Sequence, residues 1–376
     1  MSIEADSIST KEIAPTPIVQ QTAYWARVKQ KHCADSRAFH IKADLSGLYV
    51  DHPVRDRLKK EDDDLLVILQ QIDDCHQLAY VPYGPKLYPS EEYQGIFLEE
   101  LSEVLLTQLP KSCILIRYDL NWESFWSPGN DHKHKYDTWY ERPEKRIQEM
   151  RFNFNTEKWN LRKASTDVLP SNTIFLDLKK SEDDLIKAMK SKTRYNIRLS
   201  KRRGIEVDSC GMENIGLWYE LYDQTSKRNG IRSNDRTYFK NVLETKASDT
   251  KSPADVDLLI AHKGSEPLAA MFYVSTPGRA TYLYGASSDK NRRDMAPYAL
   301  QWEAVKKAKK QGCGEYDMFG ISAVPDPAHP LYGLYRFKTG FGGDIYSRMG
   351  CWDYPIQQEK YEQFSVREMN AIGFHV

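Results

Sequence analysis

The stretch TYLYGASSDKNRRDMAPYALQWEAVKKAKKQGCGEYDMFGIS, residues 281–322, decides the fold of this 376-residue chain. Its aromatic first part predicts a strand that ends at Gly285, and a polar loop follows. Pro297 then begins a helix and Gly312 ends it, because proline suits the first helical position and glycine the position just past the last turn. A second short strand covers residues 316–319. The stretch therefore predicts a β–loop–α–β unit in which loop amides and a helix start meet a ligand.

The segment 80–119 repeats this order of elements with different residues. A tyrosine-bearing strand ends at Gly84, a helix begins at Ser90, and Pro110 closes that helix before a strand over residues 114–118. We therefore expect two copies of one mixed α/β unit.

Three further strands are predicted in and just before the 281–322 unit. They cover residues 256–261, 267–274 and 280–284, and glycine-containing turns join them into an antiparallel meander. The resulting β–β–β–α–β order is that of the GNAT acyltransferase fold. The predicted fold class is α/β, with mixed sheets in two GNAT-like acyltransferase domains that pack around a cleft. Such a fold does not by itself define the chemistry.

The composition excludes several classes of protein. The 53 basic and 53 acidic residues cancel, which excludes a generally basic nucleic-acid-binding coat. No apolar run approaches the roughly 20 residues that span a bilayer, and no signal peptide is recognisable. We therefore expect a cytoplasmic protein.

Neither a metal centre nor a disulfide framework is predicted. The six cysteines are widely spread and form no C-x-x-C, which is typical of reduced thiols in a cytosolic protein. His132 and His134 form an H-x-H, but no third ligand has a fitting spacing. A solvated loop is the better interpretation of that pair.

A strongly basic segment stands out against the neutral whole. Residues 187–203 contain eight lysines and arginines and no acidic residue. Two interpretations stay open: a solvated helix face, or a surface that contacts phosphates and binds them in a salt-dependent way. The candidate contact residues are Lys192, Arg194, Arg198, Lys201 and Arg202.

Two single lysines lie in suggestive surroundings. Lys29 follows Trp25 and Val28 in a segment of helical character, and Lys338 comes just before the glycine-rich run 339–343. Glycines in such a run allow backbone to approach a ligand closely. From composition alone, an ordinary surface position is the simpler interpretation of both lysines.

Three segments together resemble the FemABX family, the aminoacyl-tRNA-dependent transferases that build peptidoglycan cross-bridges. They are SKTRYNIRLSKRRGIEV (191–207), YLYGASSDKNRRDMAPYALQWEAVKKAKKQGCGEYDMFGI (282–321) and LYRFKTGFGG (334–343). Weaker support comes from QTAYWARVK (21–29), YVPYGP (80–85) and IRYD (116–119). The resemblance covers nearly the whole chain except residues 1–17 and 121–168. The long helical hairpin that some members insert has no room here, so the chain is more similar to the compact FemX-type members.

The resemblance implies a reaction and an architecture. A small amino acid, Gly, Ala or Ser, would move from aminoacyl-tRNA to the stem-peptide amine of UDP-MurNAc-pentapeptide or lipid II, without a cofactor. Residues 18–168 with 350–376 would form the domain on the acceptor side, and residues 169–349 the domain with the catalytic lysine. We expect residues 1–17 to be a disordered lead-in and the protein to be a monomer. A lipid-linked acceptor would require a peripheral approach to the membrane surface.

The resemblance also assigns roles to single residues. Lys338, next to Phe337, matches the lysine that stabilises the transition state. Asp119 falls in the cleft as a substrate-orienting residue and candidate base, and Lys29 matches a contact to the acceptor pyrophosphate. Tyr238 and Tyr284 line the same cleft.

One position departs from the family pattern. The second phosphate-binding arginine of the family falls on Asn234, with Arg232 and Arg236 on either side. Either arginine can substitute, or the acceptor headgroup is contacted differently. The basic run 187–203 would meet the tRNA.

Two other functions stay open. The first is an acyl-CoA-dependent GNAT N-acyltransferase, although Arg293 and Met295 fit poorly in a pyrophosphate-binding loop because they lack the freedom of glycine. The second is a non-catalytic protein that binds tRNA or a cell-wall precursor. On balance, the 281–322 unit is expected to supply Tyr284 and a rigid platform, and the chemistry is expected at Lys338 rather than at the helix start.

Overall fold

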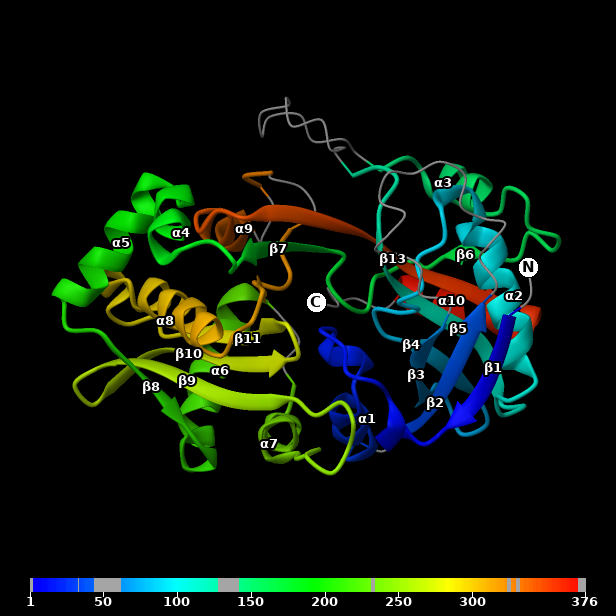
Figure 1. Ribbon diagram of the computed structural model, residues 1–376, viewed down its shortest axis with the longest axis horizontal. Helices are drawn as coiled ribbons and strands as arrows, with labels where there is room; N and C mark the ends of the chain where they lie inside the picture. Colours follow the sequence, from blue (N-terminus) through cyan, green and yellow to red (C-terminus); the bar gives the residue numbers. More distant parts are fainter. Residues whose placement is uncertain are drawn as a thin grey trace.

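The computed structural model describes residues 3–32, 34–43, 62–127, 142–230, 234–322, 326–328 and 332–370. Within these residues the strands form one continuous 13-stranded sheet. Figure 1 shows its two halves side by side, and the long strand β13 passes from one to the other. The arrangement is a mixed α/β fold, as the sequence predicts.

The first half of the sheet contains the order β1-β2-β3-β4-β5. Neighbouring strands are antiparallel except β4 and β5, which are parallel because a helix connects them. The helical connection begins as a short 3-10 turn at Glu91–Tyr93 and continues as α2 (Gln94–Leu106). The strands are β1 (Ile3–Ile8), β2 (Asp35–Ala43), β3 (Asp62–Gln71), β4 (Gln77–Val81) and β5 (Cys113–Glu123).

The second half repeats this plan. The strands β8, β9, β10 and β11 are antiparallel neighbours, β11 and β12 are parallel, and β7 pairs antiparallel with β12. The helix α8 (Ala296–Lys310) makes the connection from β11 to β12. The predicted repetition of one unit is therefore confirmed. The strands are β7 (Asn172–Asp177), β8 (Glu206–Cys210), β9 (Asp255–Lys263), β10 (Glu266–Thr276), β11 (Arg279–Ser287) and β12 (Glu315–Asp317).

The strand β13 (Asp344–Pro355) joins the halves. Its residues 344–347 pair with β7, and its residues 348–355 pair with β5. The short strand β6 (Arg162–Lys163) pairs antiparallel with Trp352 and Asp353 of β13. This change of partner lies beside the expected domain boundary at residue 349; the division into two domains stays a prediction.

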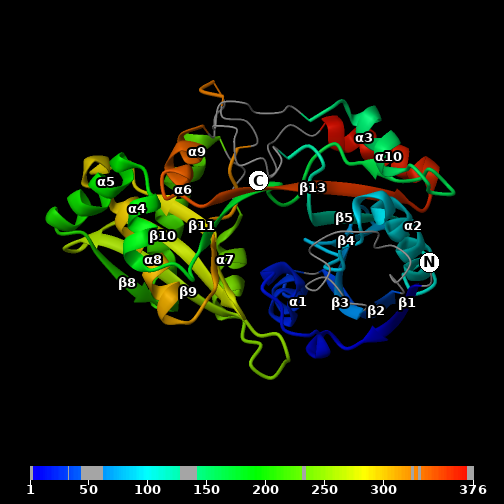
Figure 2. The ribbon, with the colours of Figure 1, turned by 45° about the horizontal axis from the view of Figure 1, so that its top comes forward.

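Three clusters of buried apolar side chains form the core. The central one contains Trp25, Leu66, Trp218 and Phe272, and so draws on both halves. Its helices are α1 (Ala23–Gln30), α6 (Ile215–Asn229) and α7 (Arg236–Glu244). Figures 1 and 2 both show α1 beside α7, and the hydroxyl of Tyr24 donates to the carbonyl of Val242 at 2.6 Å.

The two other clusters cover the outer faces. The helix α2 packs on the first half, and α8 packs on the second. The remaining helices are α3 (Lys145–Phe152), α4 (Glu182–Ala188), α5 (Ser191–Arg202), α9 (Tyr332–Thr339) and α10 (Gln358–Asn370). A side-chain cap begins α4, since the hydroxyl oxygen of Ser181 accepts a hydrogen bond from the amide of Asp184 at 3.1 Å.

The expectation of a disordered lead-in over residues 1–17 is wrong for the described residues. Residues 3–8 form the edge strand β1, in register with β2 from Ile3 opposite Ala43 to Ile8 opposite Ala38. Ile13 is fully buried. Pairing with a distant strand and burial of isolated isoleucines stabilise this segment, and neither is visible as local periodicity.

Both the backbone conformation and the lack of space require a glycine at Gly343, just before β13. It has a φ of +86°, and an added Cβ would lie 2.4 Å from the carbonyl oxygen of Phe175. Gly312 has a similar φ of +79°, but nothing lies within 4 Å of the position of its Cβ. The two glycines therefore separate backbone strain from steric overlap.

We predict that Gly312→Ala lowers the free energy of unfolding by about 1 kcal/mol, the cost of a left-handed alanine. Gly343→Ala should lower it by roughly 2 kcal/mol more, because β7 and β13 must separate to admit the methyl group. Urea denaturation of both variants measures the difference. Equal losses would show that the contact between Gly343 and β7 is not tight.

Candidate active site

A cavity of about 870 Å³ opens on the second half of the sheet. It is lined by residues from the end of β11, the following loop, the start of α8, α6 and α9. Four of the predicted site residues, Asn234, Tyr284, Phe337 and Lys338, lie in its wall. The sequence therefore predicted side chains from three distant segments that the fold brings to one cavity.

Lys338 is the buried cation of this cavity. Its side chain on α9 is 4% exposed, and Nζ donates to the carbonyl oxygens of Phe319 at 3.1 Å and Gly320 at 2.7 Å. Nζ also lies 4.9 Å from the centre of the Tyr282 ring. Burial lowers the pKa of Lys338 to about 7, although the charge of Asp317 acts in the opposite direction. An ammonium fixed in this way can stabilise negative charge that develops in the cavity.

Phe337 and the aromatic residues around it close the cavity beside Lys338. The Phe337 ring meets the Tyr298 ring edge to face, with centroids 4.9 Å apart, and Phe341 lies 5.9 Å from Tyr298 in a stacked arrangement. Such apolar walls exclude water and strengthen electrostatic interactions inside.

Tyr284 links the cavity to Lys29 in the other half. The hydroxyls of Tyr284 and Tyr238 are 2.6 Å apart. Nζ of Lys29 lies 5.5 Å from the centre of the Tyr238 ring and 5.0 Å from that of the Trp25 ring. Burial lowers the pKa of Lys29 to about 8. Among the described residues, no carboxylate lies within ion-pair distance of Lys29, so this cation is available to an anionic ligand.

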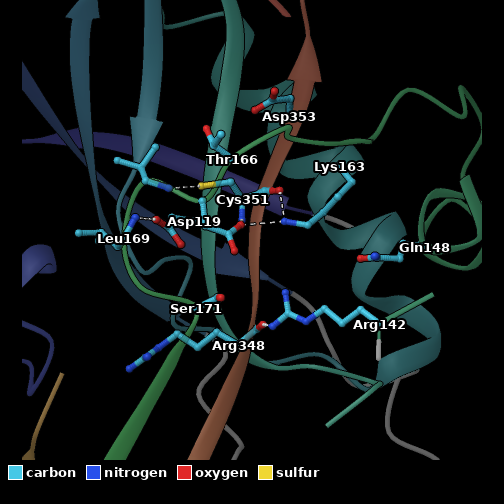
Figure 3. Close-up of polar contacts among 12 residues, drawn as sticks. Asp119, Arg142, Gln148, Lys163, Thr166, Leu169, Ser171, Arg348, Cys351 and Asp353 are labelled. Atoms are coloured by element: carbon cyan, nitrogen blue, oxygen red, sulfur yellow. Dashed lines mark hydrogen bonds and ion pairs between the residues drawn. The ribbon is translucent and has the colours of Figure 1, made fainter. Parts of the chain in front are cut away.

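Asp119 lies behind the cavity wall rather than in it. It is fully buried on β5, and its Oδ2 accepts hydrogen bonds from the hydroxyl of Tyr80 and the amide of Leu169, both at 2.9 Å. Figure 3 shows it beside Cys351, its register partner on β13. Burial, and then the charge of Asp167, raise the pKa of Asp119 to about 7.

Leu169 connects this carboxylate to the cavity. The residue that follows it, Pro170, lines the cavity, and the carbonyl oxygen of Pro170 accepts a hydrogen bond from the hydroxyl of Tyr83 at 2.7 Å. Asp119 therefore contacts the segment that forms the wall. The structure does not bring it to the cavity surface as the sequence led us to expect, because the backbone of residues 169–170 lies between.

The remaining predicted contacts lie further out. Asn234 and Arg236 are both exposed, and only Asn234 lines the cavity. Arg232, and the pair His132 and His134, lie outside the described residues.

The predicted basic surface lies on α5, away from the cavity. Lys192, Arg198, Lys201 and Arg202 are exposed. Arg194 is half-buried, and its guanidinium donates to the carbonyl oxygens of Lys187 and Met189. Arg194 thus caps the preceding helical segment, which accounts for it structurally.

Sequence reasoning missed several residues of the cavity. Tyr282 precedes the predicted Tyr284 by two positions on β11, but a register shift in the β10–β11 pairing separates them. Tyr284 packs against the central cluster and Tyr282 against the cluster under α8. Gln301 on α8 is 1% exposed, lines the cavity, and its Nε2 has no hydrogen-bond partner among the described residues. No local pattern marks such a donor, because its neighbours come from other elements.

The start of α8 also belongs to this cavity. Ala296 and Pro297 line it together with Lys338. The helix start and Lys338 therefore share one space, and the expectation that the chemistry lies at Lys338 stays a prediction. The basic residues Arg228, Lys290 and Arg292 also line it.

Within the described residues, no group of three or more His, Cys, Asp or Glu side chains is placed to hold a metal ion. None of the helices in the same ranges has the length and apolar character needed to traverse a bilayer.

Comparison with known proteins identifies relatives. The FemAB family matches residues 14–251 and 244–368. The lipid II:glycine glycyltransferase of Staphylococcus epidermidis is 24% identical over 274 residues, which are 58% of this chain and 65% of that protein. The protein of the same name from Staphylococcus haemolyticus is 23% identical over 255 residues, 52% of this chain and 61% of that protein. The matches thus cover less than two thirds of these curated relatives.

Solved structures show the same fold. The crystal structure of FemX superimposes with a TM-score of 0.68 at 17% identity, over 96% of this chain and 100% of that one. A tandem GNAT protein from the clavulanic acid biosynthesis pathway gives a TM-score of 0.50 at 10% identity, over 94% and 98%. These likenesses confirm the predicted GNAT-like fold.

Asp119 should make stability depend on pH. Its pKa in the folded chain, about 7, is above the ordinary 3.8, so the folded state holds the proton more tightly than the unfolded state. The stability due to this carboxyl group is complete below about pH 4 and is lost as the pH rises through 7. An asparagine oxygen can accept both hydrogen bonds of Oδ2 without the charge.

As the pH rises from about 4 to about 8, the unaltered chain should lose stability that Asp119→Asn keeps. We predict that the free energy of unfolding of Asp119→Asn, relative to that of the unaltered chain, rises by on the order of 3 kcal/mol over this range. Urea denaturation at the two pH values measures this gain. Asp344→Asn, at an exposed carboxylate, is the control and should show no such change. A pH-independent difference for Asp119→Asn would contradict the burial of a charge at this position.

Proposed function

Because the chain belongs to the FemAB family, we propose that it is an aminoacyltransferase that adds a small amino acid to the stem peptide of a peptidoglycan precursor. The observation that carries the proposal is the buried ammonium of Lys338 in the wall of a cavity that Tyr284 also lines. Tyr284 meets the hydroxyl of Tyr238, whose ring lies beside the cation of Lys29. The names of the curated relatives, lipid II:glycine glycyltransferases, support the choice of acceptor class.

The proposed donor is an amino acid, Gly, Ala or Ser, esterified to the 3′ end of a tRNA. The amine nitrogen of the acceptor attacks the ester carbonyl carbon and forms an amide bond. The bond from that carbon to the tRNA oxygen breaks, and the amine proton ends on the released hydroxyl by way of a base. Negative charge develops on the carbonyl oxygen, where the ammonium of Lys338 stabilises it.

Asp119 has the pKa of a suitable base, because a carboxyl group with a pKa of about 7 accepts a proton at neutral pH. Its position favours a different role. It contacts the amide of Leu169, next to Pro170 in the cavity wall. We therefore assign Asp119 to the positioning of this wall, which orients the acceptor; a role as base would require a proton carrier between the carboxylate and the cavity.

Lys29 is the proposed contact to the pyrophosphate of the acceptor. It is half-buried between two aromatic rings, and partial desolvation strengthens its attraction for phosphate oxygens. UDP-MurNAc-pentapeptide and lipid II both carry a pyrophosphate, so this contact suits either. A lipid-linked acceptor would bring the protein to the membrane surface; the cytoplasmic location and monomeric state belong to the same proposal.

The exposed residues Lys192, Arg198, Lys201 and Arg202 on α5 are the proposed contacts to the tRNA backbone. Each phosphate contact releases counterions, so donor binding should weaken with salt. Arg194 is removed from this set, because its guanidinium is engaged with two carbonyl groups.

A second candidate function, acyl transfer from an acyl-CoA, is favoured by one observation. The start of α8 and the basic residues Arg228, Lys290 and Arg292 line the cavity, and helix starts bind pyrophosphate. The same assay tests both functions. Mixed labelled aminoacyl-tRNA or labelled acetyl-CoA is offered with UDP-MurNAc-pentapeptide or lipid II, and transfer from acetyl-CoA alone would overturn the first proposal.

We predict that Lys338→Met lowers kcat for transfer by about 10² to 10³-fold with a small effect on KM, because the ammonium acts on charge present only in the transition state. Single-turnover assays with aminoacyl-tRNA measure this. Lys310→Met, at an exposed lysine at the end of α8, serves as the matched control. An unchanged kcat in Lys338→Met would remove Lys338 from the reaction.

Lys29→Ala should raise KM for UDP-MurNAc-pentapeptide by about tenfold, since a charged hydrogen bond contributes roughly 1.5 to 3 kcal/mol, and should leave KM for the tRNA unchanged. Lys31→Ala, an exposed lysine two residues further along, is the control. Unaltered acceptor affinity in Lys29→Ala would contradict the phosphate contact.

A further inference from the structure

The segment after β12 contains a backbone conformation that the sequence did not predict. We expected a strand over residues 316–319, but β12 ends at Asp317. Phe319 has a φ of +57°, in the left-handed region that side chains other than glycine rarely adopt. Such a residue costs of the order of 1 kcal/mol or more and persists only where its surroundings hold it.

The carboxylate of Asp317 holds this turn. Its Oδ1 accepts a hydrogen bond from the amide of Phe319 at 2.8 Å, and the hydroxyl of Thr173 on β7 donates to the same oxygen. From β13, Nη2 of Arg348 lies 3.8 Å from Oδ2. Asp317 is 4% exposed, so neighbours on two strands fix its position.

This turn also fixes the position of the Lys338 ammonium. The carbonyl oxygens of Phe319 and Gly320 are the two acceptors of its ammonium, at 3.1 Å and 2.7 Å. A change in the turn would move both acceptors together, and with them the Nζ atom that faces the cavity.

We propose that Asp317 is a positioning residue for Lys338: it holds the left-handed turn at Phe319 and supplies the negative charge that balances the buried ammonium. This inference rests on the transfer reaction proposed above. It adds a residue that touches no substrate and acts through the lysine. Its two contributions, geometry and charge, can be separated.

Several charged and titratable groups surround the pair. The ring of Tyr282 on β11 faces Lys338, and Asp317 acts on it as the charge that opposes desolvation. Asp317 itself faces Arg348. Burial raises the pKa of Tyr83 and of Tyr316, and the charge of Asp317 adds to this in both cases. Removing the carboxylate therefore lowers the pKa of Lys338. A larger fraction of the lysine is then neutral at any given pH near 7, and activity is lost at lower pH than in the unaltered chain.

Asp317→Asn separates charge from geometry, since the amide oxygen can still accept the hydrogen bond from Phe319. We expect the alkaline fall of kcat to move down by roughly one pH unit. The pH dependence of acetic anhydride labelling of Lys338, followed by mass spectrometry, should move in the same direction without any need for activity. Asp344→Asn is the control for both measurements.

Asp317→Glu tests geometry, and it also serves if the asparagine variant does not fold. The longer side chain keeps a charge opposite Arg348 but displaces the oxygen from the Phe319 amide. We expect kcat to fall at least about tenfold, with KM for both substrates and the labelling profile of Lys338 close to those of the unaltered chain. Circular dichroism establishes that each variant is folded.

The outcomes decide the proposal. An unmoved labelling profile in Asp317→Asn overturns the electrostatic role, and an unreduced kcat in Asp317→Glu overturns the role of the turn. If the unaltered chain transfers no amino acid, the proposed function fails. The labelling profile still tests the coupling of Asp317 to Lys338 in that case, so the two failures are distinguishable.

Discussion

The backbone pairing of β13 with both β5 and β7 is the constraint on which the rest of the structure depends. Arg348 lies where the strand changes partner, and its side chain is 1% exposed. Its Nε donates to Oδ1 of Asn121 at 2.8 Å, and its guanidinium lies 4.3 Å from the ring centre of Tyr83. On the other side it approaches Asp317. A buried guanidinium needs all of these partners, so one side chain fixes the position of each half relative to the other.

This constraint explains how a site can draw on both halves. With the halves held by β13, α1 from the first half enters the central core beside α7 of the second. Lys29 at the end of α1 therefore meets the Tyr238 ring on α7, and the hydroxyl of Tyr238 meets that of Tyr284 on β11. Tyr284 and Lys338 line the same cavity, so Lys29 of the first half reaches the wall of a cavity in the second half through two tyrosines. Neither half provides this arrangement alone.

The parts of the fold that were predictable depend on local patterns. The apolar run of residues 65–69 marks β3, Ser181 with Asp184 marks the start of α4, and Pro297 marks the start of α8. Each of these signals acts within a few residues. The strand β1, the left-handed turn at Phe319 and the place of Asp119 behind Pro170 were not predictable. The first depends on pairing with β2, the second on a carboxylate that Thr173 and Arg348 hold, and the third on the path of the backbone at Leu169. For the site, resemblance found Lys338 and Tyr284, while Asp317 and Gln301 became visible only through their partners.

Burial shifts the pKa values of two groups in opposite directions, that of the Asp119 carboxyl group in the first half and that of the Lys338 ammonium in the second. It raises the pKa of Asp119 and lowers that of Lys338, and both arrive at about 7. Below that pH Asp119 is protonated, and above it Lys338 is neutral, so the two charges coexist only around neutrality. A fold that stabilises each group in its charged form at the surface would widen this range, but it would also leave the ammonium hydrated and weaken its effect on developing charge. The charge of Asp317 acts against burial and raises the pKa of Lys338, while the carbonyl groups of Phe319 and Gly320 hold its ammonium in the dry wall.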